Sequence, residues 1–484
     1  MSDTPSPLLQ RLVGHPIATD VAIIGPDGAA GGAGTYGAIG ARARAMAAQL
    51  RGPRATLEGA RVAFLVAPSR SYVDAMFAIF LAGGCAVPLS PLHGPHEIEH
   101  VIRDCAPEAI IVSRELAPRL ESVRTSRMWI IVDDPRPTVT AHDAHVGAEA
   151  PGMILYTSGT TGTPKGVVLS QGAIAATLST LEHAWRWTRR DRLLHTLPLH
   201  HTHGVIVALL GAMWAGASAQ LLPFEAERIW ELFAESTIFM GVPTMYVKLM
   251  EAFTAATPAK RAVWSAGAHR LRLATSGSAA LSASLHRSFE EATGVKILER
   301  YGMTEIGMAL ANPYEGERVP GSVGSELRGV QIDIVDDELR VRSPQMFSGY
   351  HGDRATTDGS FDSEGRFRTG DVGVRDERGN IRLLGRASSD IIKSGGYKLS
   401  ALEIEEVLRE HPSIAEVAVI GVPDETWGER VCACAVVRAP LELEELRTFC
   451  KERMAVYKVP RELRVLTALP RNAMGKIQKK SLQS

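Results

Sequence analysis

The segment Tyr156-Thr-Ser-Gly-Thr-Thr-Gly-Thr-Pro-Lys-Gly166 follows a short apolar run, residues 153–155, and is the most informative stretch of the sequence. Its glycines allow close backbone approach to an anion, and successive backbone N–H groups can form an anion-binding nest. A triphosphate suits such a loop, so we predict a nucleotide-binding loop that precedes a helix. The spacing is not that of Walker A, in which Ser or Thr follows Gly-Lys directly. The predicted phosphate-binding residues are Thr157, Ser158, Gly159, Thr160, Thr161, Gly162 and Lys165.

Short apolar runs alternate with helix-like segments on both sides of this loop. The expected strands are residues 62–66, 85–88, 109–112, 129–132, 237–240, 271–275 and 296–298. The expected helices are residues 71–82, 96–105, 171–185, 225–235, 244–253 and 282–293. Strands alternating with helices predict a parallel sheet covered on both faces, and therefore an α/β fold.

The pattern changes near residue 381. A strand at 381–384 is followed by a polar turn, Ala387-Ser-Ser-Asp390, and then by a small α+β unit. Its expected elements are helices 401–410 and 443–454 with strands 416–420 and 431–437. We therefore expect an N-terminal domain of residues 1–386 and a C-terminal domain of residues 387–484, with the border near Arg386 to Asp390.

Composition excludes several classes of protein. The 484 residues are 45% hydrophobic and 22% charged, which is typical of a globular protein with more than one domain. Lysine and arginine number 53 and aspartate and glutamate 54, so the net charge of −1 predicts neither nucleic-acid nor membrane partners.

Sequence features also bear on the compartment. The N-terminus lacks a signal-peptide pattern, and the apolar run 204–219 is shorter than a bilayer span, so we read it as a buried helix. Five cysteines without CxxC spacing argue against disulfides or a zinc site, and Cys432 and Cys434 are expected to be buried strand residues. A cytoplasmic protein, monomeric or weakly dimeric, is expected.

Four further motifs follow the phosphate loop in order. They are Tyr301-Gly-Met-Thr-Glu305, Thr369-Gly-Asp371, Gly385-Arg386 with Lys393-Ser-Gly-Gly-Tyr397, and Pro470-Arg-Asn-Ala-Met-Gly-Lys476. Together the five motifs resemble those of the adenylate-forming superfamily, which includes acyl-CoA synthetases, firefly luciferase and peptide-synthetase adenylation domains. The resemblance spans about residues 35–479. It implies a large N-terminal domain of parallel-rich αβαβα layers with a β-subdomain, and a small mobile C-terminal domain.

The resemblance also implies roles for single residues. Tyr301 would stack on adenine beside Ser276, Gly277 and Ser278, and Asp371 would bind the ribose with Arg386 nearby. Thr304 would bind a phosphate, and Glu305 would hold Mg²⁺, a cation that prefers oxygen ligands. Lys476 would stabilise charge at the attacking carboxylate and the α-phosphate. The loop formed by Lys393, Ser394, Gly395, Gly396 and Tyr397 would receive CoA.

Arg300, directly before Tyr301, bears on the identity of the acid. An arginine next to the acyl pocket is costly to bury unless it meets an anion, and a second carboxylate of the substrate is the simplest partner. An internal ion pair, for example with Glu299, is the alternative. The surrounding segments resemble those of malonyl-CoA synthetases, including those that accept methylmalonate. The other expected acyl-site residues are His201, His203, Met303 and Met308.

These features predict an acid–CoA ligase that uses ATP, CoA and Mg²⁺ and forms malonyl-CoA, AMP and diphosphate through an acyl-adenylate. A ligase for a short-chain or aromatic monocarboxylic acid, an enzyme that loads a carrier protein, and a nucleotide-binding regulator remain alternatives. A GxGxxG match, Gly32-Ala-Gly-Thr-Tyr-Gly37, is read as part of an N-terminal hairpin and the start of a helix at residues 38–50.

Overall fold

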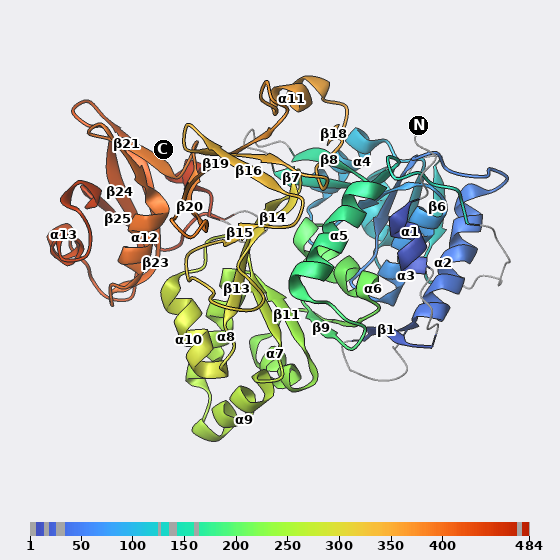
Figure 1. The fold of residues 1–484 in the computed structure, drawn as a ribbon, viewed down its shortest axis with the longest axis horizontal. Coiled ribbons are helices and arrows are strands. Elements are labelled where there is room, and N and C mark those ends of the chain that lie inside the picture. Colours follow the sequence, from blue (N-terminus) through green and yellow to red (C-terminus); the bar gives the residue numbers. More distant parts are fainter. Residues whose placement is uncertain are drawn as a thin grey trace. The chain divides into compact units, whose positions relative to one another are not determined.

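The computed structural model describes residues 6–13, 19–25, 34–123, 127–134, 143–158, 164–471 and 477–483. The chain folds into two compact units (Figure 1). Unit 1 consists of residues 1–331 with 342–365, and unit 2 of residues 332–341 with 366–484. The border predicted after Arg386 lies within unit 2. It was predicted as the point after which a C-terminal domain moves, and it remains a prediction.

The first sheet of unit 1 has the strand order β15-β14-β13-β12-β11-β9-β10-β1-β2. Its strands from β13 to β1 are parallel, and β2, β14 and β15 run antiparallel to their neighbours. The bounds are β1 Val21–Ile24, β2 Gly34–Thr35, β9 Arg192–His195, β10 Ser218–Leu221, β11 Ile238–Gly241, β12 Leu273–Ser276, β13 Ile297–Met303, β14 Gly307–Ala311 and β15 Ser325–Glu326.

The second sheet of unit 1 has the order β18-β8-β7-β4-β3-β5-β6. Strands β7, β4, β3, β5 and β6 are parallel, whereas β7, β8 and β18 pair antiparallel. The bounds are β3 Arg61–Leu65, β4 Cys85–Pro88, β5 Ala109–Val112, β6 Met128–Ile131, β7 Pro151–Ser158, β8 Pro164–Ser170 and β18 Gly349–Tyr350.

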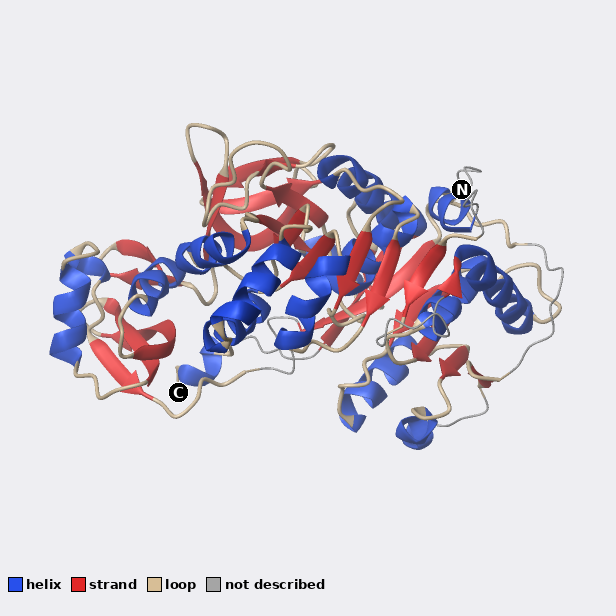
Figure 2. Ribbon diagram, turned by 90° about the horizontal axis from the view of Figure 1, so that it is seen from below, coloured by secondary structure: helices blue, strands red, loops and turns tan. Residues whose placement is uncertain are grey.

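Helices accompany the strands of both sheets (Figure 2). Trp230, Tyr246 and Phe289, from three different helices, share one buried core in which Trp230 stacks on Trp264 at a centroid distance of 5.7 Å. The α-helices are α1 Pro7–Val13, α2 Tyr36–Arg51, α3 Arg70–Leu81, α4 Pro95–Cys105, α5 Gln171–Trp185, α6 Gly211–Ala215, α7 Ala226–Leu232, α8 Pro243–Ala255, α9 Pro258–Ala268, α10 Ala283–Thr293 and α11 Arg354–Gly359. A π-helix, η3 His203–Leu210, runs directly into α6, and η2 Ala117–Val123 and η4 Phe233–Glu235 are 3-10 helices.

Unit 2 contains two smaller sheets. One has the order β16-β17-β19-β20, and the other has the order β22-β21-β24-β23 with β25 beside β24. The strands are β16 Gln331–Val335, β17 Glu338–Arg342, β19 Phe367–Arg375, β20 Ile381–Arg386, β21 Ile391–Ser394, β22 Tyr397–Ser400, β23 Ile414–Asp424, β24 Gly428–Val437 and β25 Glu462–Val465. The helices are α12 Ala401–Arg409 and α13 Leu443–Lys451, with turns η5 Val456–Lys458 and η6 Lys479–Leu482.

The α/β class and the parallel-rich sheets are confirmed, but two local predictions are wrong. The predicted helix 204–219 ends at Ala215, because Gly216 adopts a φ of 73° as its cap and Ser218–Leu221 then pairs with β9 and β1. The phosphate loop precedes a strand, β8, and not a helix, because residues 164–170 pair antiparallel with β7.

Other expectations hold. All five cysteines are free and buried, and Cys432 and Cys434 lie on β24. Strands β1 and β2 form an antiparallel hairpin, and Thr35 caps α2, so the described part of the GxGxxG segment starts a helix as expected. Among the residues described, no helix is long and apolar enough to cross a membrane.

Candidate active site

The parallel strands of the first sheet in unit 1 bring several predicted residues to one edge. Strands β9, β11, β12 and β13 are parallel, and Ser276, at the end of β12, pairs with Glu299 on β13. Ligands of open parallel sheets bind at the carboxyl ends of the strands. Ser276, Gly277, Ser278, Arg300 and Tyr301 therefore lie at the edge where this fold places a ligand.

Arg300 is the most unusual residue at this edge. Its side chain is buried, and among the described residues its Nε and Nη2 have no hydrogen-bond partner and no carboxylate pairs with it. Burial lowers its pKa to about 10. A Cβ atom at Gly277 would lie 2.4 Å from Cζ of Arg300, so a larger residue there would displace the guanidinium from its present position. The expected alternative, an internal ion pair with Glu299, is absent within the described ranges.

A group of histidines follows β9. His203 is buried, and neither ring nitrogen has a partner among the described residues. Burial, together with the positive charge of Arg300, holds the pKa of His203 well below its usual value, so its imidazole is neutral. His201 and His200 lie with ring centroids 4.0 Å apart, and His93 contacts His200 edge-on at 4.8 Å.

The turn between β13 and β14 carries the next predicted pair. The hydroxyl of Thr304 accepts a hydrogen bond of 2.9 Å from Thr202, which lies just before His203. Glu305 is buried, and its Oε1 accepts a hydrogen bond of 3.1 Å from the Tyr350 hydroxyl. Met308 is buried on β14, while Met303 accepts a weak hydrogen bond from the Tyr301 hydroxyl at 3.6 Å.

Lys165 links the phosphate loop to the same region of unit 1. Its Nζ lies 5.6 Å from the ring centroid of Tyr350, the residue that contacts Glu305. It also donates to Thr356 at 3.2 Å and lies 3.6 Å from Asp353. The ammonium group of Lys165 and the buried carboxylate of Glu305 therefore both lie near Tyr350. A cation and a carboxylate in this arrangement suit a metal-bound phosphate chain.

A single carboxylate in this place fits Mg²⁺. The described residues contain no cluster of three or more His, Cys, Asp or Glu side chains that could hold a metal. Magnesium in nucleotide sites commonly uses one or two carboxylates, with phosphates and water completing its coordination. A site with one carboxylate, Glu305, is compatible with a cation that arrives with ATP, and its role as a ligand remains a prediction.

Other predicted residues lie in unit 2. Asp371 and Arg386 are neighbours on β19 and β20, with Nε of Arg386 2.9 Å from Oδ1 of Asp371. Lys393 and Ser394 end β21, and Tyr397 begins β22. Between them, Gly395 and Gly396 adopt φ values of 57° and 83°, which form the tight turn of this hairpin.

Some predicted residues cannot be placed. Gly159, Thr160, Thr161, Gly162 and Lys476 lie outside the described residues. Thr157 and Ser158 close strand β7 immediately before the phosphate loop.

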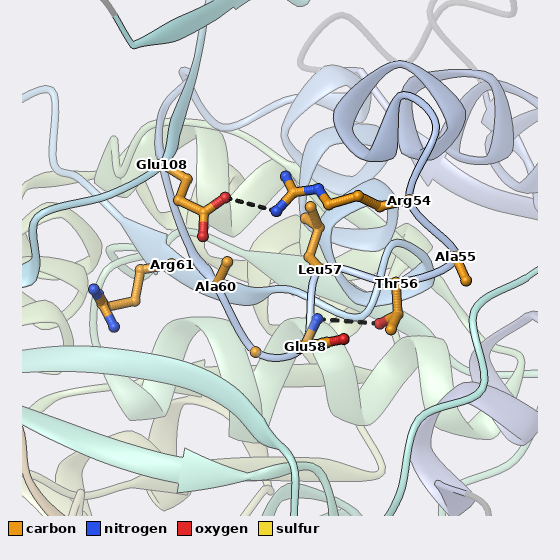
Figure 3. Close-up of a pocket in the computed structure, with 9 residues that line it drawn as sticks. Arg54, Ala55, Thr56, Leu57, Glu58, Ala60, Arg61 and Glu108 are labelled. Carbon is orange, nitrogen blue, oxygen red and sulfur yellow. Dashed lines mark hydrogen bonds and ion pairs between the residues drawn. The ribbon is translucent and has the colours of Figure 1, made fainter.

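A separate hollow of about 520 Å³ lies elsewhere in unit 1 (Figure 3). It is lined by residues 54–61 and Glu108, and Arg54 is paired with Glu108 at 2.9 Å. None of the predicted site residues lines it, and its charges are mixed, so it does not compete with the edge of the first sheet as the catalytic site.

Comparison with known proteins identifies the family. A family profile for AMP-binding enzymes matches residues 14–351, and a profile for the AMP-binding enzyme C-terminal domain matches residues 403–476. The chain belongs to the AMP-binding enzyme family. This AMP-binding enzyme is 41% identical over 478 residues to the mitochondrial malonate–CoA ligase ACSF3 of Mus musculus, covering 88% of this chain and 82% of the relative.

Solved structures of related enzymes resemble this AMP-binding enzyme along its whole length. ATP-bound MatB from Rhodopseudomonas palustris has a TM-score of 0.89 and 32% identity, with 99% of this chain and 98% of that chain covered. A malonyl-CoA ligase product complex with methylmalonyl-CoA and AMP has a TM-score of 0.71 and 36% identity, covering 96% of this chain and all of the other.

Several residues of this AMP-binding enzyme join the site without having been predicted. They are Thr202, which contacts Thr304, Tyr350, which lies between Glu305 and Lys165, and Asp353 and Thr356, which contact Lys165. Thr202 lies between the predicted His201 and His203, whereas the segment that contains Tyr350, Asp353 and Thr356 carries no local pattern that marks it. Only the pairing of β18 with β8 brings Tyr350 beside the loop.

Proposed function

We propose that this enzyme is a malonate–CoA ligase, which converts malonate, ATP and CoA into malonyl-CoA, AMP and diphosphate through malonyl-adenylate. Membership of the AMP-binding enzyme family and the malonate–CoA ligases among its relatives support the reaction. Methylmalonate is a further candidate substrate, since one structural relative was solved with methylmalonyl-CoA.

The observation that carries the choice of acid is the buried, unpaired guanidinium of Arg300. Burying a charged group without a partner is costly, and a carboxylate that accepts hydrogen bonds from Nε and Nη2 offsets that cost. Neutral His203 can donate a further hydrogen bond to the same anion. A monocarboxylate would leave both groups unsatisfied, so a dicarboxylate is the better ligand.

The adenylation step can be assigned to residues of this chain. The substrate carboxylate attacks the α-phosphate of ATP, and diphosphate leaves. Lys165 and Thr304 bind phosphate oxygens, Tyr301 with Ser276 and Ser278 holds adenine, and Asp371 binds the ribose hydroxyls. Glu305 would hold Mg²⁺, which would neutralise phosphate charge when ATP is bound. Lys476 stabilises the charge that develops at the reacting oxygens.

The second step transfers the acyl group to sulfur. The CoA thiol, as thiolate, attacks the carbonyl carbon of malonyl-adenylate, and AMP leaves. In this proposal the residues after Arg386 rotate, which removes Lys476 and brings the loop of residues 393–397 to the site. A cytoplasmic location and a monomeric or weakly dimeric state belong to the same proposal.

The test of the acid is the variant Arg300→Ala. Loss of a buried charge that binds the substrate carboxylate should lower kcat/KM for malonate by about 100-fold or more. Turnover of propionate, which has no second carboxylate, should change little. Arg318→Ala, which removes an arginine bonded to the backbone carbonyls of Pro313 and Tyr314, serves as the control and should affect both acids alike. Unchanged malonate turnover in Arg300→Ala would refute the proposed contact.

A further inference from the structure

A buried cluster of charges in unit 2 has no part in the reaction described above. Nζ of Lys479 lies 2.6 Å from Oδ1 of Asp390 and 2.7 Å from Oε1 of Glu405. The three side chains are 11%, 13% and 3% exposed. Lys479 follows Lys476 by three residues, and Asp390 follows Arg386 by four.

Both carboxylates are fixed independently of Lys479. Glu405, on α12, pairs with Arg409 at 2.8 Å and accepts a hydrogen bond of 2.9 Å from the backbone of Val419. Oδ2 of Asp390 accepts a hydrogen bond of 2.9 Å from the backbone of Arg386. Burial alone would lower the pKa of Lys479, but Glu405 and Asp390 outweigh it and raise that pKa, so the ammonium stays charged.

The chain on either side of residues 472–476 is also held. Arg471 and Ile477 form an antiparallel bridge, and the backbone N–H of Gln478 donates to the carbonyl of Pro470 at 2.8 Å. Leu469 and Leu482 pack in a small apolar cluster with β23 and β24. Ile404 and Leu408 belong to a separate and larger core of apolar side chains.

We propose that Lys479 is a positioning residue that fixes the C-terminal segment to the part of the chain following Arg386, and thereby sets the place of Lys476 for adenylation. The inference rests on the proposed function, in which a rotation after Arg386 delivers Lys476. A rotating body places a reacting group accurately only if that group is attached rigidly, and small misplacements lower rates steeply. Asp390 attaches Lys479 close to Arg386, after which the proposed rotation occurs, and Glu405 attaches Lys479 to helix α12.

The test measures the two half-reactions separately in the full-length enzyme. Lys479→Met should lower malonate-dependent ATP–diphosphate exchange by about tenfold or more, while thioesterification of supplied malonyl-adenylate stays within about twofold of wild type. Lys479→Arg, which keeps the charge, should recover most of the exchange. The matched control is Lys480→Met, which alters the exposed neighbouring lysine and should leave both half-reactions unchanged.

Equal loss of both half-reactions in step with a lower melting temperature would assign Lys479 a merely structural role and overturn the proposal, as would unchanged exchange. If Lys479→Met does not fold, Asp390→Asn tests the same contact and should show the same split. Failure of the proposed function looks different: the wild type would make no malonyl-CoA, or Lys476→Ala would retain exchange. If only this inference fails, the wild type still makes malonyl-CoA and Lys476→Ala still loses exchange, but Lys479→Met keeps it.

Discussion

Among single residues, burial determines the charge states of the side chains at the proposed acyl site. The charge of Arg300 influences the protonation of His203. The guanidinium stays charged, since burial lowers its pKa only to about 10, and its positive charge helps to keep the imidazole of His203 neutral. One charged donor and one neutral donor can therefore serve the same carboxylate. The arrangement favours an anion without adding a second buried positive charge.

The nearby histidines predict how stability depends on pH. Burial lowers the pKa of His200 to about 2 and that of His201 to about 4, so the folded state keeps both neutral. The unfolded chain binds protons from about pH 6.5 downward, so stability is full above that pH and falls as the pH drops toward the folded values. We expect His200→Phe to reduce the loss of unfolding free energy between about pH 7 and about pH 5.5 by up to about 1 kcal/mol.

Urea unfolding at the two pH values measures this difference. His96→Gln, which alters an exposed histidine on α4, is the control and should keep the wild-type pH dependence. If the His200→Phe protein has the same pH dependence as wild type, His200 binds protons in the folded state as it does in the unfolded chain, which would contradict the expectation.

At the scale of the element, helix α4 holds the two strand ends that flank the phosphate loop. The Tyr156 hydroxyl, on β7, donates to Asp104 at 2.5 Å, and Nε2 of His100 lies 2.9 Å from the carbonyl of Pro164 on β8. Both contacts come from one face of α4. They fix the strand from which Lys165 projects, because Lys165 directly follows Pro164.

Tyr156→Phe should loosen this support. Loss of the hydrogen bond to Asp104 is expected to lower the free energy of unfolding by about 1 kcal/mol and to raise KM for ATP by about threefold to tenfold. Steady-state kinetics with saturating malonate and CoA checks this. Tyr36→Phe removes a buried hydrogen bond of 2.7 Å to Ala217 and should cost similar stability with KM for ATP unchanged. Equal KM values in the two variants would contradict a role for α4.

The same scale shows what the sequence could predict. Strands such as β4 and β5 and helices such as α5 were predicted with correct bounds, because continuous apolar runs and helical spacing end at turn residues. The run 204–219 was predicted to be one helix because it is apolar throughout. Residues Ser218–Leu221 form strand β10 because they pair with β1 and β9, which are separate segments of the chain. Contacts such as Tyr350 with Glu305 were equally inaccessible, since they depend on β18 joining β8.

Across the whole chain, the residues with proposed roles in the reaction belong to two structural units. Arg300, Thr304, Glu305 and Lys165 lie in unit 1, while Asp371 and Arg386 lie in unit 2. The roles that the motifs imply for these residues, and for Lys476, remain predictions. The proposed rotation between half-reactions would give separate tasks to the terminal lysine and to the glycine hairpin of residues 394–397.

Lys476→Ala tests that division. We expect malonate-dependent ATP–diphosphate exchange to fall by about 100-fold or more, because the fixed cation at the reacting oxygens is lost. Thioesterification of supplied malonyl-adenylate should persist, since the lysine is withdrawn for that step. Loss of both half-reactions to the same degree would contradict the alternating arrangement.

The most direct measurement of the central claim is the mass of the product formed by wild-type enzyme with ATP, Mg²⁺ and CoA. Malonate, methylmalonate, propionate and benzoate would be supplied in turn. We expect malonyl-CoA with equimolar AMP, and little propionyl-CoA or benzoyl-CoA. Preferential formation of a monocarboxylic acyl-CoA, with malonate unused, would contradict it.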